Sequence, residues 1–458
     1  MSGTFSSMNS ALSALRYNRV AMDVASQNIA NAPTTGYARR QVVAQSTGAP
    51  AVPALWSKWD GAGGGVEASS VNRLVDPVID ARARTEHSAA SFLDMKSTSL
   101  TRLETAIAEP GDGGVAKALD DFKSAWHNLS NSTPQTASTN RTAVLSAGAT
   151  LSNTISGQAA AVDHEWDTQH TALDNAVTEV NALSGQLADL NRGLRAANLS
   201  GTDAGTLLDQ RDTITLRLAE LTGAKVGINA DTTAEVTVGG QTLVSGNTAH
   251  QVSVGGATGL AGVGGDPVTL AVDGTTVVVG TGEAGAAQSM LNTELPGYLG
   301  KLDGFVAEMT SAVNAQQMAG KDQDGNPGAE FWSGTTAATV QVAITDGRAL
   351  AGADPAKGAT DGSNAAKLGN LDLGAGSYRS LVTAFGSAVA SVKQGAGSQA
   401  TLSAAVDAQR ESLSGVNQDE EMVNLMAAQR GYEGAARVLT AMDSMLDTLI
   451  NNTGMVGR

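Results

Sequence analysis

The last helix-forming stretch of this 458-residue chain carries an apolar repeat that restricts what it can pack against. Between residues 425 and 449, apolar side chains recur at alternating intervals of three and four residues: Leu425, Ala428, Tyr432, Ala435, Leu439, Met442, Leu446 and Leu449. This 3.5-residue spacing is typical of a helix that packs along another helix in a coiled coil. The sequence therefore predicts one buried seam and a partner helix.

The beginning of the chain carries a weaker version of the same repeat. Arg19 and Ser26 interrupt it, and the apolar positions are Phe5, Met8, Leu12, Leu15, Met22 and Ile29. Pro33 disfavours helix at the residue before it, so we expect a helix over 4–31. Because a short helix pair is only marginally stable alone, we predict that the two ends pair with each other and with further copies. These apolar residues form the predicted assembly interface.

Composition excludes several classes of protein. Aromatic residues make up 3% of the chain and glycines number 53, which suits long thin helices and small β units with Ala, Leu and Val cores. A net charge of −16 without a basic cluster argues against nucleic acid and against anionic membranes as partners. The absence of cysteine excludes disulfides. No apolar run approaches the length of a membrane span, and we expect no secretory signal.

Periodicity predicts a nested, mainly α fold. Extended chain follows the first helix, and helices are expected over 76–131, with a break near Pro110, and then over 139–198 and 204–222. The helix over 139–198 would be about 90 Å long, which favours a rod. Alternating residues and Gly-rich turns predict β structure over 224–281. Further along the chain we expect a helix over 284–318, loops and short strands over 319–375, and helices over 376–394 and 398–415.

We therefore predict a mainly α fold with an inserted β domain. Residues 1–60 and 416–458 would form a terminal coiled-coil domain. An elongated helical domain would combine 61–222 with 283–415, and 223–282 would form a small, outer, all-β module. Because both termini return to one place, we expect the β module to lie far from them.

Two motifs suggest chemistry and are better explained as turns. Residues 280–285 match the dinucleotide-binding glycine pattern, but the following helix leaves no room for the required second parallel strand. Residues 321–326 begin like a calcium loop, but Pro327 and Ser333 replace the required Gly and Glu. The five histidines are scattered, and the acidic residues 419–421 suit the first turn of a helix. We predict no catalytic residue, cofactor or metal, and hence no enzyme.

Several segments resemble a known family. The residues Asn28, Ile29, Asn31, Gly36 and Tyr37 are similar to the N-terminal signature of bacterial flagellar rod, hook and hook-associated proteins, with the usual proline shifted. The C-terminal segment resembles the hook-associated protein 1 family through Gly415, Val416, Asn417, Glu420 and Glu421, and through residues 429–432 and 446–451. The internal segments 207–212 and 295–299 are similar to segments of the same family. They distinguish this chain from rod and hook proteins, which share only the motifs at the two ends.

The resemblance implies a structural role at the junction between the flexible hook and the rigid filament. It implies unfolded export by the flagellar type III apparatus and an extracellular location in the flagellum. The implied partners are the hook protein, hook-associated protein 3 and an export chaperone that covers the C-terminal helix.

Two alternative functions stay open. A hook or distal-rod protein would not be expected to contain the long helix 139–198, and a secreted cell-wall-acting enzyme would need a catalytic arrangement.

Overall fold

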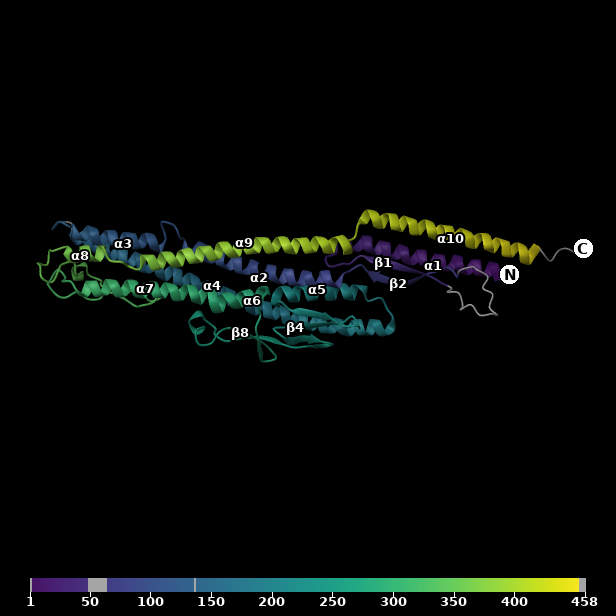
Figure 1. Cartoon of the computed structure of the whole chain (residues 1–458), viewed down its shortest axis with the longest axis horizontal. Helices are drawn as coiled ribbons and strands as arrows, with labels where there is room; N and C mark the ends of the chain where they lie inside the picture. Colours follow the sequence, from purple (N-terminus) through teal and green to yellow (C-terminus); the bar gives the residue numbers. More distant parts are fainter. Residues whose placement is uncertain (1, 48–63, 136, 453–458) are drawn as a thin grey trace, which may run out of the picture.

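A computed structural model describes residues 2–47, 64–135 and 137–452. It shows an elongated, mainly α molecule with both termini at one end (Figure 1). Helices α1 (Ser2–Asn31) and α10 (Gln418–Asn452) lie side by side and project beyond the rest of the chain. The predicted fold class, with paired terminal helices, a helical rod and a small β unit, is confirmed.

Long helices form the rod. They are α2 (Pro77–Ile107), α3 (Val115–Ser130), α4 (Ala137–Ser200), α5 (Gly205–Thr222), α7 (Leu295–Met318) and α9 (Ala375–Ser414). The 64-residue α4 confirms the predicted long helix and is about 96 Å long. Its apolar stripe, from Val144 through Trp166 to Leu194, is buried against the other helices. This stripe gives the rod a continuous apolar core, because α4 runs along most of its length (Figure 1).

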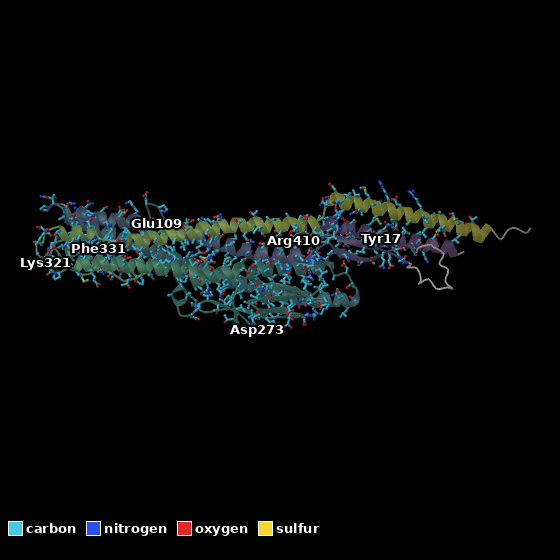
Figure 2. The ribbon with its side chains drawn as sticks, viewed as in Figure 1. Tyr17, Glu109, Asp273, Lys321, Phe331 and Arg410 are labelled. Carbon is cyan, nitrogen blue, oxygen red and sulfur yellow. The ribbon has the colours of Figure 1, made fainter. Side chains whose placement is uncertain are left out.

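Helix α6 (Gly282–Ser289) lies near the middle of the rod and continues through a π turn (Met290–Glu294) into α7, which runs towards the end opposite the termini (Figure 1). Shorter elements complete that far end. Helix α8 (Ser363–Gly369) was not predicted, because it lies in a stretch rich in glycine and loops. The strands β10 (Trp332–Ser333) and β11 (Gln341–Val342) pair there. Figure 2 places Lys321 and Phe331 at this end and Tyr17 on the terminal pair at the other.

The prediction of two helices over 376–394 and 398–415 is wrong, because α9 runs unbroken through Gly395 and Gly397. A glycine inside a helix costs about 1 kcal/mol relative to alanine. Helix α9 packs along α2 for much of its length, and a Cβ at Gly395 would lie 3.7 Å from Leu93 Cδ1 of α2. Tertiary packing therefore outweighs the local propensity of these glycines to end a helix.

Besides the β10–β11 pair, strands occur in two regions. Near the terminal helices, β1 (Arg40–Ser46) and β2 (Val66–Arg73) form an antiparallel pair beside α1. The inserted unit contains one four-stranded and one three-stranded sheet, both antiparallel. The first comprises β3 (Lys225–Ile228), β4 (Ala234–Val238), β5 (Gln241–Ser245) and β6 (Thr248–Ala249). The second comprises β7 (Val252–Gly255), β8 (Thr269–Val272) and β9 (Thr275–Val277).

The β unit does not lie at the end of the rod opposite the termini, so that expectation was wrong. The unit packs on the side of the rod, against the C-terminal half of α4, and the end opposite the termini is built by α3, α8 and neighbouring loops (Figure 1). Two asparagines of α4 hold it there. Asn181 exchanges two hydrogen bonds with the backbone of Val252, at 2.8 and 2.9 Å, and Asn191 does the same with Ala234, at 2.9 Å each.

The chain enters and leaves the β unit at one point. Gly223, at the end of α5, and Gly282, at the start of α6, have positive φ angles of 65° and 75°. A Cβ on Gly282 would lie 2.8 Å from the backbone nitrogen of Gly223, so the two glycines lie next to each other. The strand-to-helix turn predicted over 280–285 is present here, and β9, the strand before it, pairs antiparallel with β8.

His87 of α2 links three helices of the rod. Its Nδ1 lies 3.1 Å from Glu220 Oε1 of α5, and its Nε2 lies 2.9 Å from Asp407 Oδ2 of α9. The hydrogen bond to Glu220, joined by that to Asp407, raises the pKa of His87 above its usual value. Both nitrogens face carboxylates, so only the protonated ring can donate to both.

We therefore expect the contribution of His87 to stability to depend on pH. Because its pKa is raised on folding, the stabilisation is fully present below its unfolded pKa of about 6.5 and is lost as pH rises through the folded value. Urea denaturation of the parent chain and of His87→Gln should give a free-energy difference that shrinks from pH 6 to alkaline pH. His164→Gln, at an exposed position of α4, serves as a histidine control. A difference that grows with pH would contradict this assignment.

Candidate functional site

The terminal helices form an antiparallel pair. Asn28 of α1 lies beside Glu421 of α10, and Asn18, ten residues earlier on α1, lies against Gly431, ten residues later on α10. On α10, Ala428 and Ala435 are buried in the contact. The predicted residues Leu425, Leu439, Met442 and Leu446 are half-buried, and Tyr432 is 39% exposed. The side chains of Phe5 and Leu449 lie outside the part of the chain that the structure describes.

The predicted stripe of α1 is not centred on α10. Ala11 and Ala25 are buried, and they share a helix face with Asn18, which contacts α10. Leu12 is 39% exposed, and Met8, Leu15, Met22 and Ile29 are half-buried. A strict seven-residue spacing drifts by about 20° per heptad on a straight helix. The stripe therefore starts on the flank of α1 and turns towards α10 only near Ile29.

Asn28 is the centre of a buried polar cluster at the base of the pair. Its side-chain amide donates to the carbonyl of Arg40 and to Glu421 Oε2, each at 2.9 Å. Its Oδ1 accepts from the backbone N–H of Arg40 at 3.0 Å and from the Tyr37 hydroxyl at 2.8 Å. The structure thus brings three of the family-motif residues, Asn28, Tyr37 and Glu421, into direct contact. Burial raises the pKa of Tyr37, so its hydroxyl stays a donor at neutral pH.

Glu421 does more than complement the dipole of α10. It is 3% exposed and accepts hydrogen bonds from Asn28 and from Arg39, whose Nη2 lies 2.7 Å from Oε1. The neighbouring Glu420 pairs with the same arginine at 3.0 Å. Asn417 caps the helix by accepting from the backbone N–H groups of Asp419 and Glu420 at 3.0 and 3.3 Å. The backbone N–H of Arg39 also donates to Ser414, at the end of α9.

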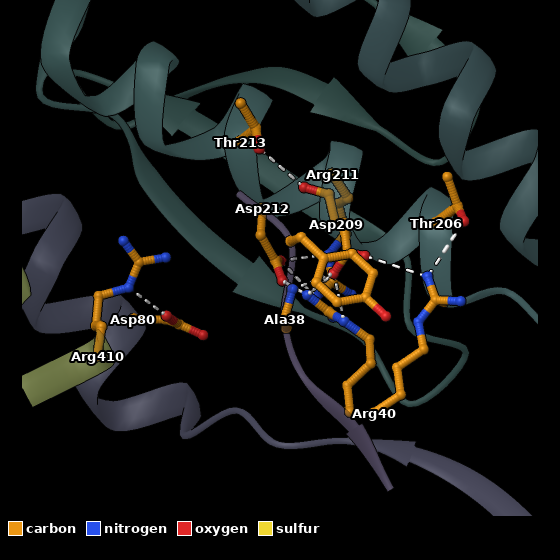
Figure 3. A network of polar contacts seen from close by, with 12 residues as sticks. Ala38, Arg40, Asp80, Thr206, Asp209, Arg211, Asp212, Thr213 and Arg410 are labelled. Carbon is orange, nitrogen blue, oxygen red and sulfur yellow. Dashed lines mark hydrogen bonds and ion pairs between the residues drawn. The ribbon is translucent and has the colours of Figure 1, made fainter. Parts of the chain in front are cut away.

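A second set of charges ties the strands to α5 (Figure 3). Asp209 lies 2.8 Å from the Arg73 guanidinium and 3.3 Å from that of Arg40. Arg73 also contacts Asp212 at 2.7 Å. Burial raises the pKa of Asp209, and the two guanidiniums oppose that shift. These contacts hold β1 and β2 on α5, so the terminal pair is connected rigidly to the rod. Nearby, Arg410 of α9 pairs with Asp80 of α2 at 2.9 Å (Figure 3).

Gly36 shows why the motif requires a glycine. Its φ of 81° is a left-handed conformation that side chains disfavour. A Cβ would also lie 2.4 Å from Thr213 Oγ1 of α5. The turn after α1 can therefore approach α5 only with glycine at this position, and this turn directs Tyr37 towards Asn28.

Sequence reasoning did not identify Arg39, Arg40, Arg73, Asp209 or Asp212 as members of this site. The segment 207–212 resembled a family segment, but nothing in its pattern indicates a contact with Arg39, Arg40 or Arg73.

A cavity of about 880 Å³ lies beside the cluster, lined by Asn31, Tyr37 and Arg40 among others. Within the described ranges, no group of histidine and acidic residues is arranged to hold a metal ion. The same ranges contain no helix long and apolar enough to span a bilayer.

Models of flagellar families match three parts of the chain. The flagellar hook-associated protein FlgK helical domain matches residues 100–332. The flagellar basal body rod FlgEFG protein C-terminal model matches residues 409–452, and the flagella basal body rod protein model matches residues 8–37. The two rod models cover most of α1 and all of α10, and the helical-domain model covers the chain from the last turns of α2 to the start of β10.

Whole-chain relatives agree with these matches. Flagellar hook-associated protein 1 of Bacillus subtilis is 27% identical, over 100% of both chains. The protein of the same name from Escherichia coli is 23% identical, over 97% of this chain and 99% of its own. The fold is similar to that of the flagellar hook junction protein FlgK from Burkholderia pseudomallei, with a TM-score of 0.65 and 16% identity over 73% of this chain and 100% of that one. The chain belongs to the FlgK family of flagellar hook-associated proteins.

Proposed function

We propose that this chain is a structural axial protein of the bacterial flagellum that joins the hook to the filament. The observation that supports this most is the α1–α10 pair, which projects from the rod and is braced at its base by Asn28, Arg39 and Glu421. A projecting helix pair with exposed apolar side chains is suited to assembly with copies of itself. On α10, Met422, Val423 and Met426 are 49%, 60% and 45% exposed.

We propose three units with different roles. The terminal unit comprises 1–60 and 416–458, and we extend it to Arg73 because β2 pairs with β1 beside α1. This unit would build the inner tube. The helical unit, which continues to residue 222 and resumes over 283–415, would form a shell around it. The β unit 223–282 would lie on the outside.

We further propose partners and a location. In a junction, one end of the assembly would contact the hook protein and the other would contact hook-associated protein 3. Before assembly, the exposed apolar face of α10 needs a cover, and an export chaperone would supply one. The protein would act outside the cell after export through the flagellar type III apparatus. Membranes and nucleic acid are not proposed partners.

We propose no catalytic activity. The polar cluster around Asn28 and Asp209 is explained by its contacts between elements, and its carboxylates are paired with arginines. A hook or distal-rod role is less well supported, because α4 forms a 64-residue helix that the FlgK helical-domain model covers in full. A cell-wall-acting enzyme would need a nucleophile or paired acids in a cleft.

Deleting the gene is expected to produce cells whose hooks carry no filaments. Without the junction, filament subunits have no ring on which to assemble, so swimming should be lost. Electron microscopy of the deletion strain, with plasmid-borne wild-type chain as the control, measures this. Filaments of normal length on the mutant hooks would contradict the proposed function, and missing hooks would favour a rod or hook role.

A further inference from the structure

A cleft of about 380 Å³ lies between α2, α4 and the first turn of α6, near the middle of the rod (Figure 1). Its size falls within the range of small-ligand sites, about 300–1,000 Å³. The residues that matter here are Asp94, Met95 and Thr98 of α2, Gln169 and Ala172 of α4, and Glu283 of α6. The lining therefore combines carboxylates, a hydroxyl and an amide with short apolar walls.

Gln169 is the most buried of these side chains and has an unused acceptor. It is 1% exposed, and its amide nitrogen donates to Glu165 Oε1 at 2.8 Å. This bond fixes the orientation of the amide, because an ionised carboxylate can only accept. Among the described residues, Gln169 Oε1 has no hydrogen-bond partner. A buried carbonyl oxygen without a donor costs free energy, which a donor entering the cleft would recover.

The charges around the cleft favour a cation. Asp94 is exposed and forms no ion pair or hydrogen bond within the described ranges. Glu283 shares the Arg217 guanidinium with two further carboxylates, so negative charge is in excess there. Arg102 also lines the cleft, but Glu165 already neutralises it, with contacts of 2.7 and 3.0 Å.

A guanidinium group matches this arrangement better than a metal ion. Its five N–H donors lie in one plane and can reach separate acceptors at once, such as Gln169 Oε1, the Asp94 carboxylate and the Thr98 hydroxyl. Met95 and Ala172 offer apolar contact to the methylene groups of the stem. A metal ion needs several ligands in one coordination sphere, and the described ranges contain no such group of histidine and acidic residues.

We infer that this cleft binds an alkylguanidinium group, with its planar end on Gln169 Oε1 and its charge beside Asp94 and Glu283. The same chemistry is offered by the arginine side chain of a protein and by a free alkylguanidine. This inference goes beyond the proposed function, because the cleft lies on the rod, away from α1 and α10, and a single chain forms it completely (Figure 1).

NMR titration of the purified full chain tests the site. The probe is the capped peptide acetyl-Gly-Arg-Gly-amide, and its control contains citrulline, which has the shape of arginine without the charge. We expect the side-chain amide signals of Gln169 to shift in a saturable way with the arginine peptide and to stay in place with the citrulline peptide. Gln158 is the internal reference, because it is buried and its Oε1 already accepts from Tyr298 and Tyr378, at 3.3 Å each.

Two substitutions locate the binding. Gln169→Met removes the acceptor, and the affinity should fall by about tenfold or more, as expected for a lost hydrogen bond to a charged group. The backbone amide of Ala172 reports binding in this variant. Asp94→Asn changes an exposed side chain, and it should weaken binding by about threefold and reduce its salt dependence. Asp163→Asn is the matched control, because Asp163 is exposed on α4 outside the cleft, and it should bind like the parent chain.

A second titration with agmatine, a free alkylguanidine, separates the two sources of the ligand. Both outcomes with saturable binding support the inference: tighter binding of the peptide assigns the cleft to an arginine side chain, and tighter binding of agmatine assigns it to a free alkylguanidine. The inference is overturned if neither probe gives a saturable shift, if the citrulline peptide binds equally well, or if Gln169→Met and Asp94→Asn bind as tightly as the parent chain.

Discussion

Leu439→Asp is expected to abolish filament attachment while leaving the rod folded. Leu439 is half-buried in the seam between α10 and α1, where an aspartate would place a charge against apolar side chains. The loss of apolar burial and the desolvation of the charge should cost on the order of 2–4 kcal/mol, which a marginally stable helix pair cannot absorb. Swimming assays and electron microscopy of complemented deletion cells would measure attachment.

Two controls separate assembly from folding in this experiment. Thr440→Asp introduces the same charge one residue along, at an exposed position, and should retain swimming. Circular dichroism of purified Leu439→Asp should show the cooperative melting of the rod at the temperature of the parent chain. Normally attached filaments on Leu439→Asp cells would show that the seam is not needed for assembly.

Asn28→Leu is expected to destabilise the terminal unit where α1, β1 and α10 meet. The substitution keeps the size of the side chain but removes the acceptor for the Tyr37 hydroxyl and the Arg40 N–H, and the donor to Glu421. A buried polar group left without a partner costs about 1–3 kcal/mol, so we expect a total loss of about 2–4 kcal/mol. Urea denaturation followed by circular dichroism would measure it.

Asn31→Leu is the matched control for Asn28→Leu. Asn31 lies one turn later on α1; its amide donates to the carbonyl of Gln27 at 2.9 Å, and its Oδ1 accepts one long hydrogen bond from Thr34 Oγ1 at 3.5 Å. Its replacement should change stability by no more than about 0.5 kcal/mol. Equal losses for the two variants would show that the Asn28 cluster does not hold α1, β1 and α10 together.

Local pattern was sufficient to predict most of the helices. The stripe of α4 matches its buried face, and Pro33, Gly36 and the 110–114 segment mark helix ends or breaks where the structure has them. The fold class followed from these elements, because a 64-residue helix and paired seams at the two ends leave few compact alternatives. The glycines of α9 misled the prediction, since a close helix neighbour compensates for their low propensity.

The polar cluster could not be predicted, because it depends on contacts between distant parts of the chain. Asn28 and Glu421 are 393 residues apart, and neither has a periodicity that indicates a partner. From the sequence, the acidic first turn of α10 was explained by the helix dipole alone. The structure adds the ion pair between Glu421 and Arg39. Likewise, the side of α1 that meets α10 depends on where β1 and β2 pack. Apolar repeats predict that a helix has a partner, but the orientation follows from the whole fold.

The adjacent ends of the β unit have a consequence for how proteins of this kind diversify. Because Gly223 and Gly282 lie next to each other, the chain leaves the rod and returns to it at one point. The number of residues between them can therefore change without moving the ends of α5 and α6. Such a site tolerates insertion, because an enlarged, reduced or different module can be placed there without shifting the flanking helices. The module can therefore change in size without displacing α5 and α6, as long as the face that Asn181 and Asn191 hold on α4 is kept.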